Sequence, residues 1–342
     1  MTGFQLAIKS TGLVTSVGLS APASCAAIRA KISNPTETVF VNAMAEPISG
    51  HEVLLGTPWR GRWRLVRLAA LAVEECVVDL EPKQLDGIQV YLCLAETQRA
   101  GRLPDLDASL LADVCGELGI RCAPQSEVVA LGRVGVVYAL ARCRAGLANG
   151  ASRLALVIAV DSLLNDEALD AYDRAQRLLT PDNSDGFLPG EGAGAVLVGP
   201  PGEHPELRCT GLGFGLEPAH VESDLPLRGD GLAAAVRAAL AEAGCGLHDV
   251  DYRIADLSGE HYYFKEAALV LGRLLRVVRP EIDIWHPAEC IGETGALAGL
   301  VILGVAEAAA RKGYAPGRRA LAHFSSDHGE RAAAILEYVG PR

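Results

Sequence analysis

The sequence predicts an α/β protein built from two similar halves, with mostly parallel mixed sheets and helices on their faces. Short apolar runs alternate with segments of helical periodicity along the chain, which is the order that parallel sheets require. The segment from Gly190 to Leu197 is echoed in letters and place by the segment from Gly329 to Leu336. Hydrophobic residues make up 50% of the chain and charged residues 21%, which suits a folded protein with ample core.

The first half is expected to begin with a strand at 6–14, because a short apolar run is closed there by Gly and Ser. A helix at 65–76 follows from apolar residues spaced three and four apart on one face. Residues 32–61 show no periodicity, so we expect irregular structure there. A dense turn signal at 181–186 lies within a long connection. The remaining elements are a helix at 21–30, strands at 88–95 and 128–129, a helix at 132–149, and strands at 154–160 and 190–198.

The second half repeats this order of elements. Its expected elements are a strand at 207–212, a helix at 232–242, a strand at 252–257, a helix at 267–275, a short apolar segment at 282–285, a helix at 294–311, and strands at 320–324 and 332–337. The halves are expected to join near residues 200–205. We therefore divide the chain into an N-terminal half, 1–204, and a C-terminal half, 205–342.

Charge and hydropathy exclude several classes of function. The formal net charge is −11 and the pI is about 5.3, so neither nucleic acid nor an anionic membrane surface is expected as a partner. No apolar run reaches the roughly 20 residues that cross a bilayer, and the first residues lack the pattern of a secretory signal. A cytoplasmic location is the resulting expectation.

The nine cysteines are scattered along the chain, without a CxxC pair or a His/Cys cluster at zinc-ligand spacing. No metal, no cofactor and no disulfide framework is therefore expected. The cysteines are expected to be reduced and mostly packed in the core as small hydrophobic residues.

The segment 59–67 mixes four arginines with two tryptophans. Such a mixture suits contact with nucleic acid or an acidic protein. It also suits the start of an amphipathic helix whose arginines pair with carboxylates of the same acidic chain, and we favour this second interpretation.

A longer motif carries a resemblance to a known family. Asp161 and Ser162 follow an expected strand, and Asp185 to Ala195 reads DGFLPGEGAGA. With Thr11 to Thr15 near the start, this pattern resembles the β-ketoacyl synthase family of the thiolase-like fold. The resemblance implies a five-layered α/β/α/β/α architecture of two duplicated halves, and usually a homodimer. It would also explain the internal echo.

The same resemblance implies that the catalytic set of the family is missing. The family places a nucleophilic cysteine at a helix start, where this chain reads Gly132-Arg133. Its two histidines correspond to Ser258 and Glu293, and its lysine corresponds to Ala288. The site is therefore expected to be degenerate, and we assign no catalytic residue.

Other polar residues fall on loops that the resemblance directs toward the same cavity. Cys290 with His261 or His286 as a base could form a substitute catalytic set, but we favour loop residues in a filled cavity. The resemblance implies a glycine-rich loop where this chain has residues 325–329. In the family that loop supplies the second hydrogen-bond donor to the oxyanion, so we do not assign this donor to 325–329. Glu293 could act as a general base, or its carboxylate could cap the helix that follows, and we favour the cap.

Three classes of function follow. The favoured class is a non-catalytic ketosynthase-like protein that acts as a structural, adaptor or chaperone partner. The resemblance implies that such chains occur beside active ketosynthases of fatty acid or polyketide biosynthesis, or in bacterial type VI secretion loci. The alternatives are an acyl-ligand binding protein and a condensing or acyltransferase enzyme with atypical residues.

The expected partners are a second copy of the chain or a related ketosynthase-like chain. The contact is expected through the region before the helix that starts at Gly132, because an apolar edge strand would otherwise be left unpaired. A protein client or an acyl carrier protein is a further possible partner.

Overall fold

The computed structural model describes residues 5–150, 153–279 and 282–340. The first part of the chain forms β1 (Leu6–Val14), α1 (Ala21–Arg29), β2 (Thr36–Val41), β3 (Pro47–Gly50), α2 (Gly61–Cys76), α3 (Pro82–Leu85), β4 (Gln89–Cys93), α4 (Leu106–Leu118), β5 (Glu127–Val129), α5 (Gly135–Ala148), β6 (Ala155–Ser162), α6 (Asp166–Arg174) and β7 (Glu191–Gly199). The second part forms β8 (Glu206–Leu216), α7 (Asp230–Ala243), β9 (Tyr252–Ala255), α8 (His261–Leu274), β10 (Ile284–Trp285), α9 (Ala288–Ile291), α10 (Ala298–Arg311), β11 (Arg319–Ser325) and β12 (Glu330–Val339).

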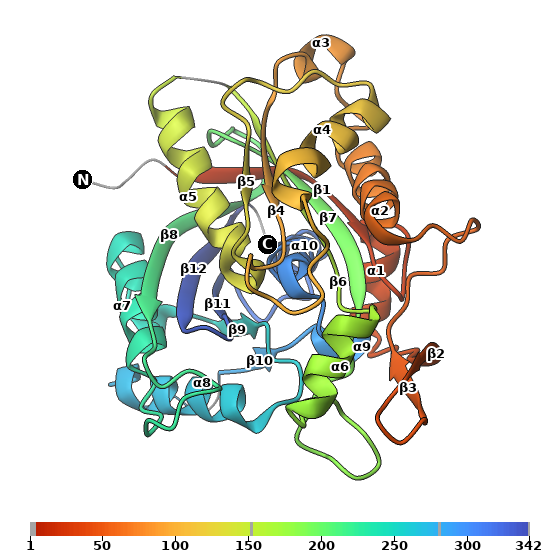
Figure 1. Ribbon diagram of the computed structural model, residues 1–342. Coiled ribbons are helices and arrows are strands. Elements are labelled where there is room, and N and C mark those ends of the chain that lie inside the picture. The colour runs from red at the N-terminus through yellow and green to blue at the C-terminus, as the bar shows by residue number, and fades with distance from the viewer. Residues whose placement is uncertain (1–4, 151–152, 280–281, 341–342) are drawn as a thin grey trace.

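Ten of the twelve strands named above form one curved sheet in the order β10-β9-β11-β12-β8-β1-β7-β6-β4-β5 (Figure 1), and β2 pairs with β3 in a separate sheet. Strand β1 meets β8 in an antiparallel pair at Leu6 and Ala7. On either side of this pair the strand order is equivalent, since β7, β6, β4 and β5 correspond to β12, β11, β9 and β10. The division of the chain at residue 204 stays a prediction.

The expected α/β architecture with a mixed sheet is confirmed, but antiparallel pairing is more frequent than the alternation of strands and helices predicts. Only β4 with β5 and β6, and β9 with β10 and β11, pair in parallel among the named neighbours of this sheet. The expectation of mostly parallel sheets is therefore corrected. Strands β11 and β12 are joined by residues 326–329 alone, and so short a connection cannot make the crossover that parallel strands need.

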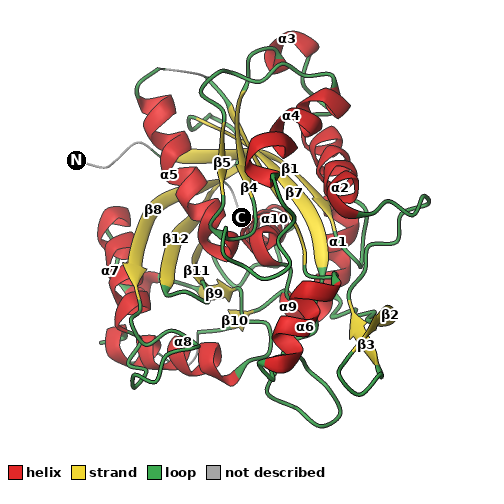
Figure 2. Cartoon of the chain, in the orientation of Figure 1, coloured by secondary structure: helices red, strands yellow, loops and turns green. Residues whose placement is uncertain are grey.

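Helices α5 and α10 lie between the two parts of the sheet and form the middle of five layers (Figure 2). Strand β6 shows how both of its faces become buried. Val157 and Ala159 pack in the same core as α5 and α10, whereas Leu156 and Ile158 pack in the core beneath α2. On the other part of the sheet, α7 covers β8 and β12. The continuous apolar run of β6 is the sequence signature of a strand buried on both faces.

Several parts of the first half differ from the sequence-based expectation, including α3 and α4, for which no element was predicted. Residues 32–61 contain the hairpin of β2 and β3, and the connection after β6 contains α6. The hairpin escapes periodicity analysis because β2 is largely exposed, with only Thr38 and Phe40 partly buried. The start of α6 does carry a signal, since the Asn165 side chain accepts a hydrogen bond from the backbone N–H of Ala168 as an N-cap.

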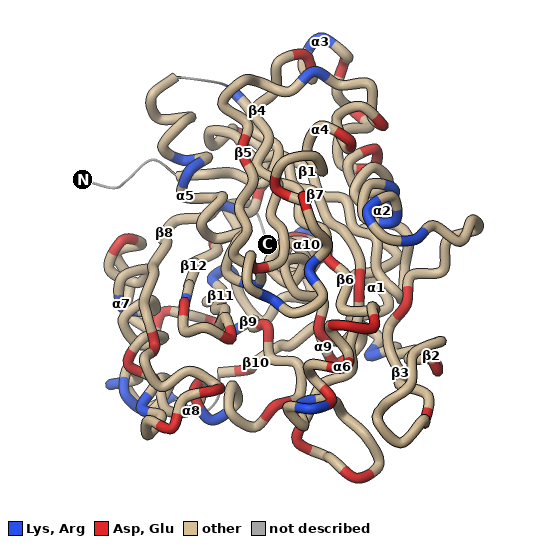
Figure 3. The backbone as a smooth tube through the Cα atoms, viewed as in Figure 1, with Lys and Arg blue, Asp and Glu red and all other residues tan. Residues whose placement is uncertain are grey.

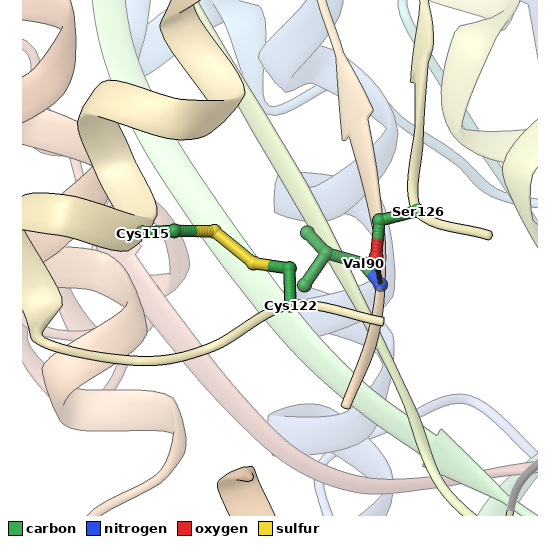
Figure 4. The surroundings of a disulfide bond; sticks show 4 residues. All are labelled: Val90, Cys115, Cys122 and Ser126. Atoms are coloured by element: carbon green, nitrogen blue, oxygen red, sulfur yellow. Dashed lines mark hydrogen bonds between the residues drawn. A yellow bond between two sulfur atoms is a disulfide. The ribbon is translucent and has the colours of Figure 1, made fainter. Parts of the chain in front are cut away.

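The expectation that all cysteines are reduced is wrong for one pair. Cys115 near the end of α4 and Cys122 in the following loop form a disulfide (Figure 4). Gly119 ends α4 in the left-handed conformation, and this turn brings the chain back toward Cys115. A cross-link that closes so short a loop stabilises the fold by about 2–3 kcal/mol in the chain-entropy picture. The other seven cysteines are free, and all but Cys245 are buried.

The arginines at the start of α2 pair within the chain. Arg62 contacts Asp113 at 3.0 Å and Arg67 contacts Glu117 at 3.1 Å, so α2 places its basic residues against acidic residues of α4 (Figure 3). Arg64 reaches the buried Glu191 of β7. These contacts are those of an amphipathic helix on an acidic chain.

Among the described residues, no helix is both long and apolar enough to span a membrane.

Candidate functional site

Arg133 lies at the helix start where the resemblance predicts a degenerate nucleophile position. Gly132 and Arg133 lie in a single 3-10 turn that leads into α5, and Gly132 takes a positive φ of 51°. That conformation favours glycine, so the turn directs the Arg133 side chain into the interior, where the residue is only 5% exposed. A cation is unfavourable at a helix N-terminus because the helix dipole is positive there. Arg133 therefore needs anionic partners.

Acidic and aromatic side chains surround the Arg133 guanidinium. Its Nη1 donates to Glu293 Oε2 at 3.3 Å, and its Nη2 contacts Asp327 Oδ1 at 2.5 Å. The same Nη2 donates to the Tyr263 hydroxyl at 2.8 Å, and the guanidinium carbon lies 4.5 Å from the centre of the Tyr263 ring. Asp256 Oδ2 is 4.0 Å from Nε. The position expected to hold a reactive group thus holds a fully engaged cation.

A second arginine shares one of these partners. Arg177, which follows α6, donates from Nε and Nη2 to the two carboxylate oxygens of Glu260 at 2.7 and 2.9 Å. Its Nη1 donates to Asp327 Oδ2 at 2.8 Å. Asp327 lies in the loop between β11 and β12 and bridges the two arginines. We call Arg133, Arg177, Glu260, Tyr263, Glu293 and Asp327 the arginine network.

Burial and the arginines act in opposite directions on the acidic groups. Burial alone would raise the pKa of Asp327, but Arg133 and Arg177 outweigh it and hold this pKa well below the ordinary value. For Glu293 burial dominates and raises the pKa despite Arg133. Burial also raises the pKa of Asp256 to about 6. The site therefore holds one firmly ionised carboxylate between two cations.

Glu293 also has a structural role in the backbone around it. Its Oε1 accepts a hydrogen bond at 2.8 Å from the N–H of Gly295, which opens the turn before α10. Its carbonyl accepts one at 2.8 Å from Gly190, in the glycine-rich motif. A Cβ on Gly190 would lie 2.4 Å from the Ile291 carbonyl oxygen, so only glycine permits this approach. Ser258 lies beside the Glu293 carboxylate.

The arginine network leaves little open space. The cavity between Arg133, Arg177, Glu293 and Asp327 measures about 20 Å³, which is room for about one water molecule. A neighbouring hollow lined by Ala288 and Glu293 measures about 10 Å³. Among the described residues, no group of three or more His, Cys, Asp or Glu side chains is arranged to hold a metal ion. Neither hollow has room for an acyl chain.

Solved structures match this chain over nearly its whole length at low sequence identity. Neither the known family models nor the curated protein sequences contain a match. The ishigamide ketosynthase/chain length factor matches with a TM-score of 0.77 and 19% identity, over 99% of this chain and 100% of that chain. A ketosynthase in complex with its chain length factor from Xenorhabdus doucetiae matches with a TM-score of 0.79 and 12% identity, over 98% of each chain. A β-ketoacyl synthase from Burkholderia phymatum matches with a TM-score of 0.73 and 13% identity, over 98% of this chain and 100% of that chain.

The chain has the thiolase-like ketosynthase fold. The resemblance seen in the sequence is confirmed at the level of the fold. The ketosynthase fold brings Arg133, Ser258 and Glu293 together, and Ala288 lines the adjoining hollow.

Among the described residues, no hydrogen bond or ion pair joins the side chains of the other three sequence-based candidates to the arginine network. Cys290 Sγ is buried and faces the Ile28 carbonyl at 3.9 Å, and burial raises its pKa to about 11. His286 packs its ring against Phe264. His261 is exposed at the start of α8. Within the described ranges, no hydrogen bond joins Cys290 to either histidine, so the substitute set lacks the geometry that nucleophilic catalysis needs.

Sequence reasoning did not identify several residues of this site. Arg177 and Tyr263 lie on a loop and a helix whose pattern gives no sign that they are buried. Asp256 carried a usable signal, because it directly follows β9 and the carboxyl ends of parallel strands meet at one edge of a sheet.

Proposed function

We propose that this chain is a non-catalytic ketosynthase-like subunit that works through a protein partner. The observation that carries the proposal is the position of Arg133, which stands where a nucleophile would open α5 and is held by Glu293 and Asp327. An arginine stays protonated in proteins and has no lone pair to attack an acyl group. The filled cavity supports the same conclusion, since an acyl chain has no room beside the arginine network.

The structural neighbours support a partnered role. Two of them are described as a ketosynthase with a chain length factor, and another as a type II polyketide synthase acyl-carrier protein in complex with its ketosynthase, with a TM-score of 0.81 and 16% identity. We therefore place an active ketosynthase or an acyl carrier protein first among the candidate partners. A gene neighbourhood with a carrier protein would favour biosynthesis, and one with toxin or spike genes would favour type VI secretion.

The protein is expected to take up no acyl group from acyl-CoA or from an acylated carrier protein. The physical reason is that no thiol lies at the start of α5 and that Cys290 is kept protonated by burial. Intact-mass spectrometry after incubation with the donors measures the outcome. A stoichiometric mass increase that disappears in Cys290→Ala would instead establish the alternative, an acyltransferase with atypical residues.

A dimer, with itself or with a related chain, is the expected assembly. Strand β5 ends the sheet and precedes Gly132, so its outer edge has unpaired backbone groups that a second chain could satisfy. We expect an obligate interface above about 2,000 Å². Light scattering on the purified chain, alone and mixed with a candidate partner, measures this, and a stable monomer in both samples at micromolar concentration would argue against it.

The cytoplasmic location remains a proposal. The Cys115–Cys122 disulfide argues against this location, because disulfides persist mainly in oxidising compartments. Counting free thiols in protein extracted under acid quench from its host tests the point: nine free thiols indicate a reduced cytoplasmic form, and seven indicate the cross-linked one.

A further inference from the structure

A cleft of about 180 Å³ lies apart from the arginine network, between α1, the segment from β10 to α9, and the end of α10. Its inner wall is apolar and includes the buried side chains of Ile28, Pro287 and Val305. Its outer wall is aromatic, because the Trp285 and Tyr314 rings stack with centroids 6.4 Å apart and planes 25° apart. An apolar cavity of about 150 Å³ is known to hold a benzene ring, so this cleft has room for one aromatic ring and a short chain.

The charges around the cleft leave one cation available. Lys31 pairs with Glu289 and gives this carboxylate a counter-ion, and His286 Nδ1 lies 4.0 Å from the same carboxylate. Arg29 is different. Its guanidinium lies over the Tyr314 ring, 4.1 Å from the centroid, and among the described residues it forms no ion pair. The cleft therefore combines an apolar floor, aromatic walls and one unpaired guanidinium at its mouth.

From this combination we propose that the cleft binds small aromatic carboxylates, with the ring against the apolar wall and the carboxylate on Arg29. A guanidinium binds a carboxylate through two parallel hydrogen bonds, and stacking on Tyr314 presets its orientation. Small-molecule sites are generally apolar clefts with few polar groups, and this cleft has that composition. The proposal concerns a site apart from the former catalytic position, so it does not depend on the proposed function.

The test uses Trp285 as a reporter. The chain has three tryptophans, and Trp59→Phe with Trp63→Phe leaves Trp285 alone. We would titrate this protein with 3-phenylpropionate and, separately, with 3-phenylpropan-1-ol, which has the same ring and chain but no charge. The expected result is a saturable change in Trp285 fluorescence with one site per chain, and binding of the acid about tenfold tighter than that of the alcohol. The preference should weaken as salt is raised, because Arg29 is exposed.

Two variants make the assignment specific. Arg29→Met keeps the apolar stem and should abolish the preference for the acid, while Arg237→Met, an exposed arginine of α7, should leave it unchanged. Tyr314→Leu should weaken both probes. Absence of saturable binding, equal affinities of the two probes, or a preference that survives Arg29→Met would each overturn the proposal. None of these outcomes bears on whether the chain accepts acyl groups.

Discussion

Arg331→Met is expected to lower the free energy of unfolding by about 3–5 kcal/mol, because it leaves a carboxylate buried without its counter-ion. Arg331 and Glu266 are both 0% exposed in their side chains, and Arg331 Nε lies 2.8 Å from Glu266 Oε1. Arg331 also donates to the Ser326 carbonyl at 2.7 Å, so it fixes the loop that carries Asp327. For a chain of this length the loss corresponds to a melting temperature lower by about 4–7 °C, if unfolding is all-or-none.

Two comparisons separate this effect from ordinary loss of an ion pair. Arg319→Met breaks a pair with Glu337 that is partly exposed, and it should cost about 1 kcal/mol or less. Combining Arg331→Met with Glu266→Leu removes both buried charges, so the double variant should be more stable than Arg331→Met alone. Calorimetry on the four proteins checks this, and a double variant less stable than the single one would contradict the explanation.

Asp327→Asn is expected to cost a similar amount, about 3–5 kcal/mol at pH 7, since it removes the anion that bridges Arg133 and Arg177. The cost should depend on pH in a defined direction. The folded-state pKa of Asp327 lies below its ordinary value, so its stabilisation is present above about pH 4 and is lost as the pH falls.

The measurement is the difference in stability between wild type and Asp327→Asn, taken by denaturant unfolding at several pH values. Taking the difference reduces the contribution of Asp256, whose raised pKa acts in the opposite sense, but does not remove it, because both carboxyl groups lie beside Arg133. Asp86→Asn, which breaks an exposed pair with Arg121, serves as control and should change stability little. A difference that is negligible at pH 7, or that persists undiminished below pH 4, would show that Asp327 is not held as described.

Much of the fold could be predicted because its strands are buried on one or both faces. The expected strand at 6–14 matches β1, and the duplicated order of elements agrees with the symmetric order of strands in the sheet. The β2–β3 hairpin was missed because its exposed residues carry no apolar alternation. The Cys115–Cys122 disulfide was missed because spacing alone does not show that the turn at Gly119 brings the two sulfurs together.

The candidate site could be predicted by position but not by content. The motif at Asp185 to Ala195 carried the resemblance from which a degenerate site was expected, and the replacement of the catalytic residues stays a prediction. Asp327 pairs with Arg133, which lies 194 positions earlier in the sequence, and with Arg177, which lies 150 positions earlier. Such long-range pairing leaves no periodic trace in one sequence.

A chain without condensing chemistry should fail to decarboxylate a malonyl group, a step that needs no nucleophile and that two histidines assist in the family that the sequence resembles. We would measure carbon dioxide release from a malonyl group carried by acyl carrier protein, with an active ketosynthase as positive control. If Ser258 and Glu293 stand in place of the histidines, as the resemblance implies, and because the cavity measures only about 20 Å³, we expect a rate equal to that of heat-denatured protein. Saturable release above that background, lost in Glu293→Gln, would show that Glu293 belongs to a working catalytic site.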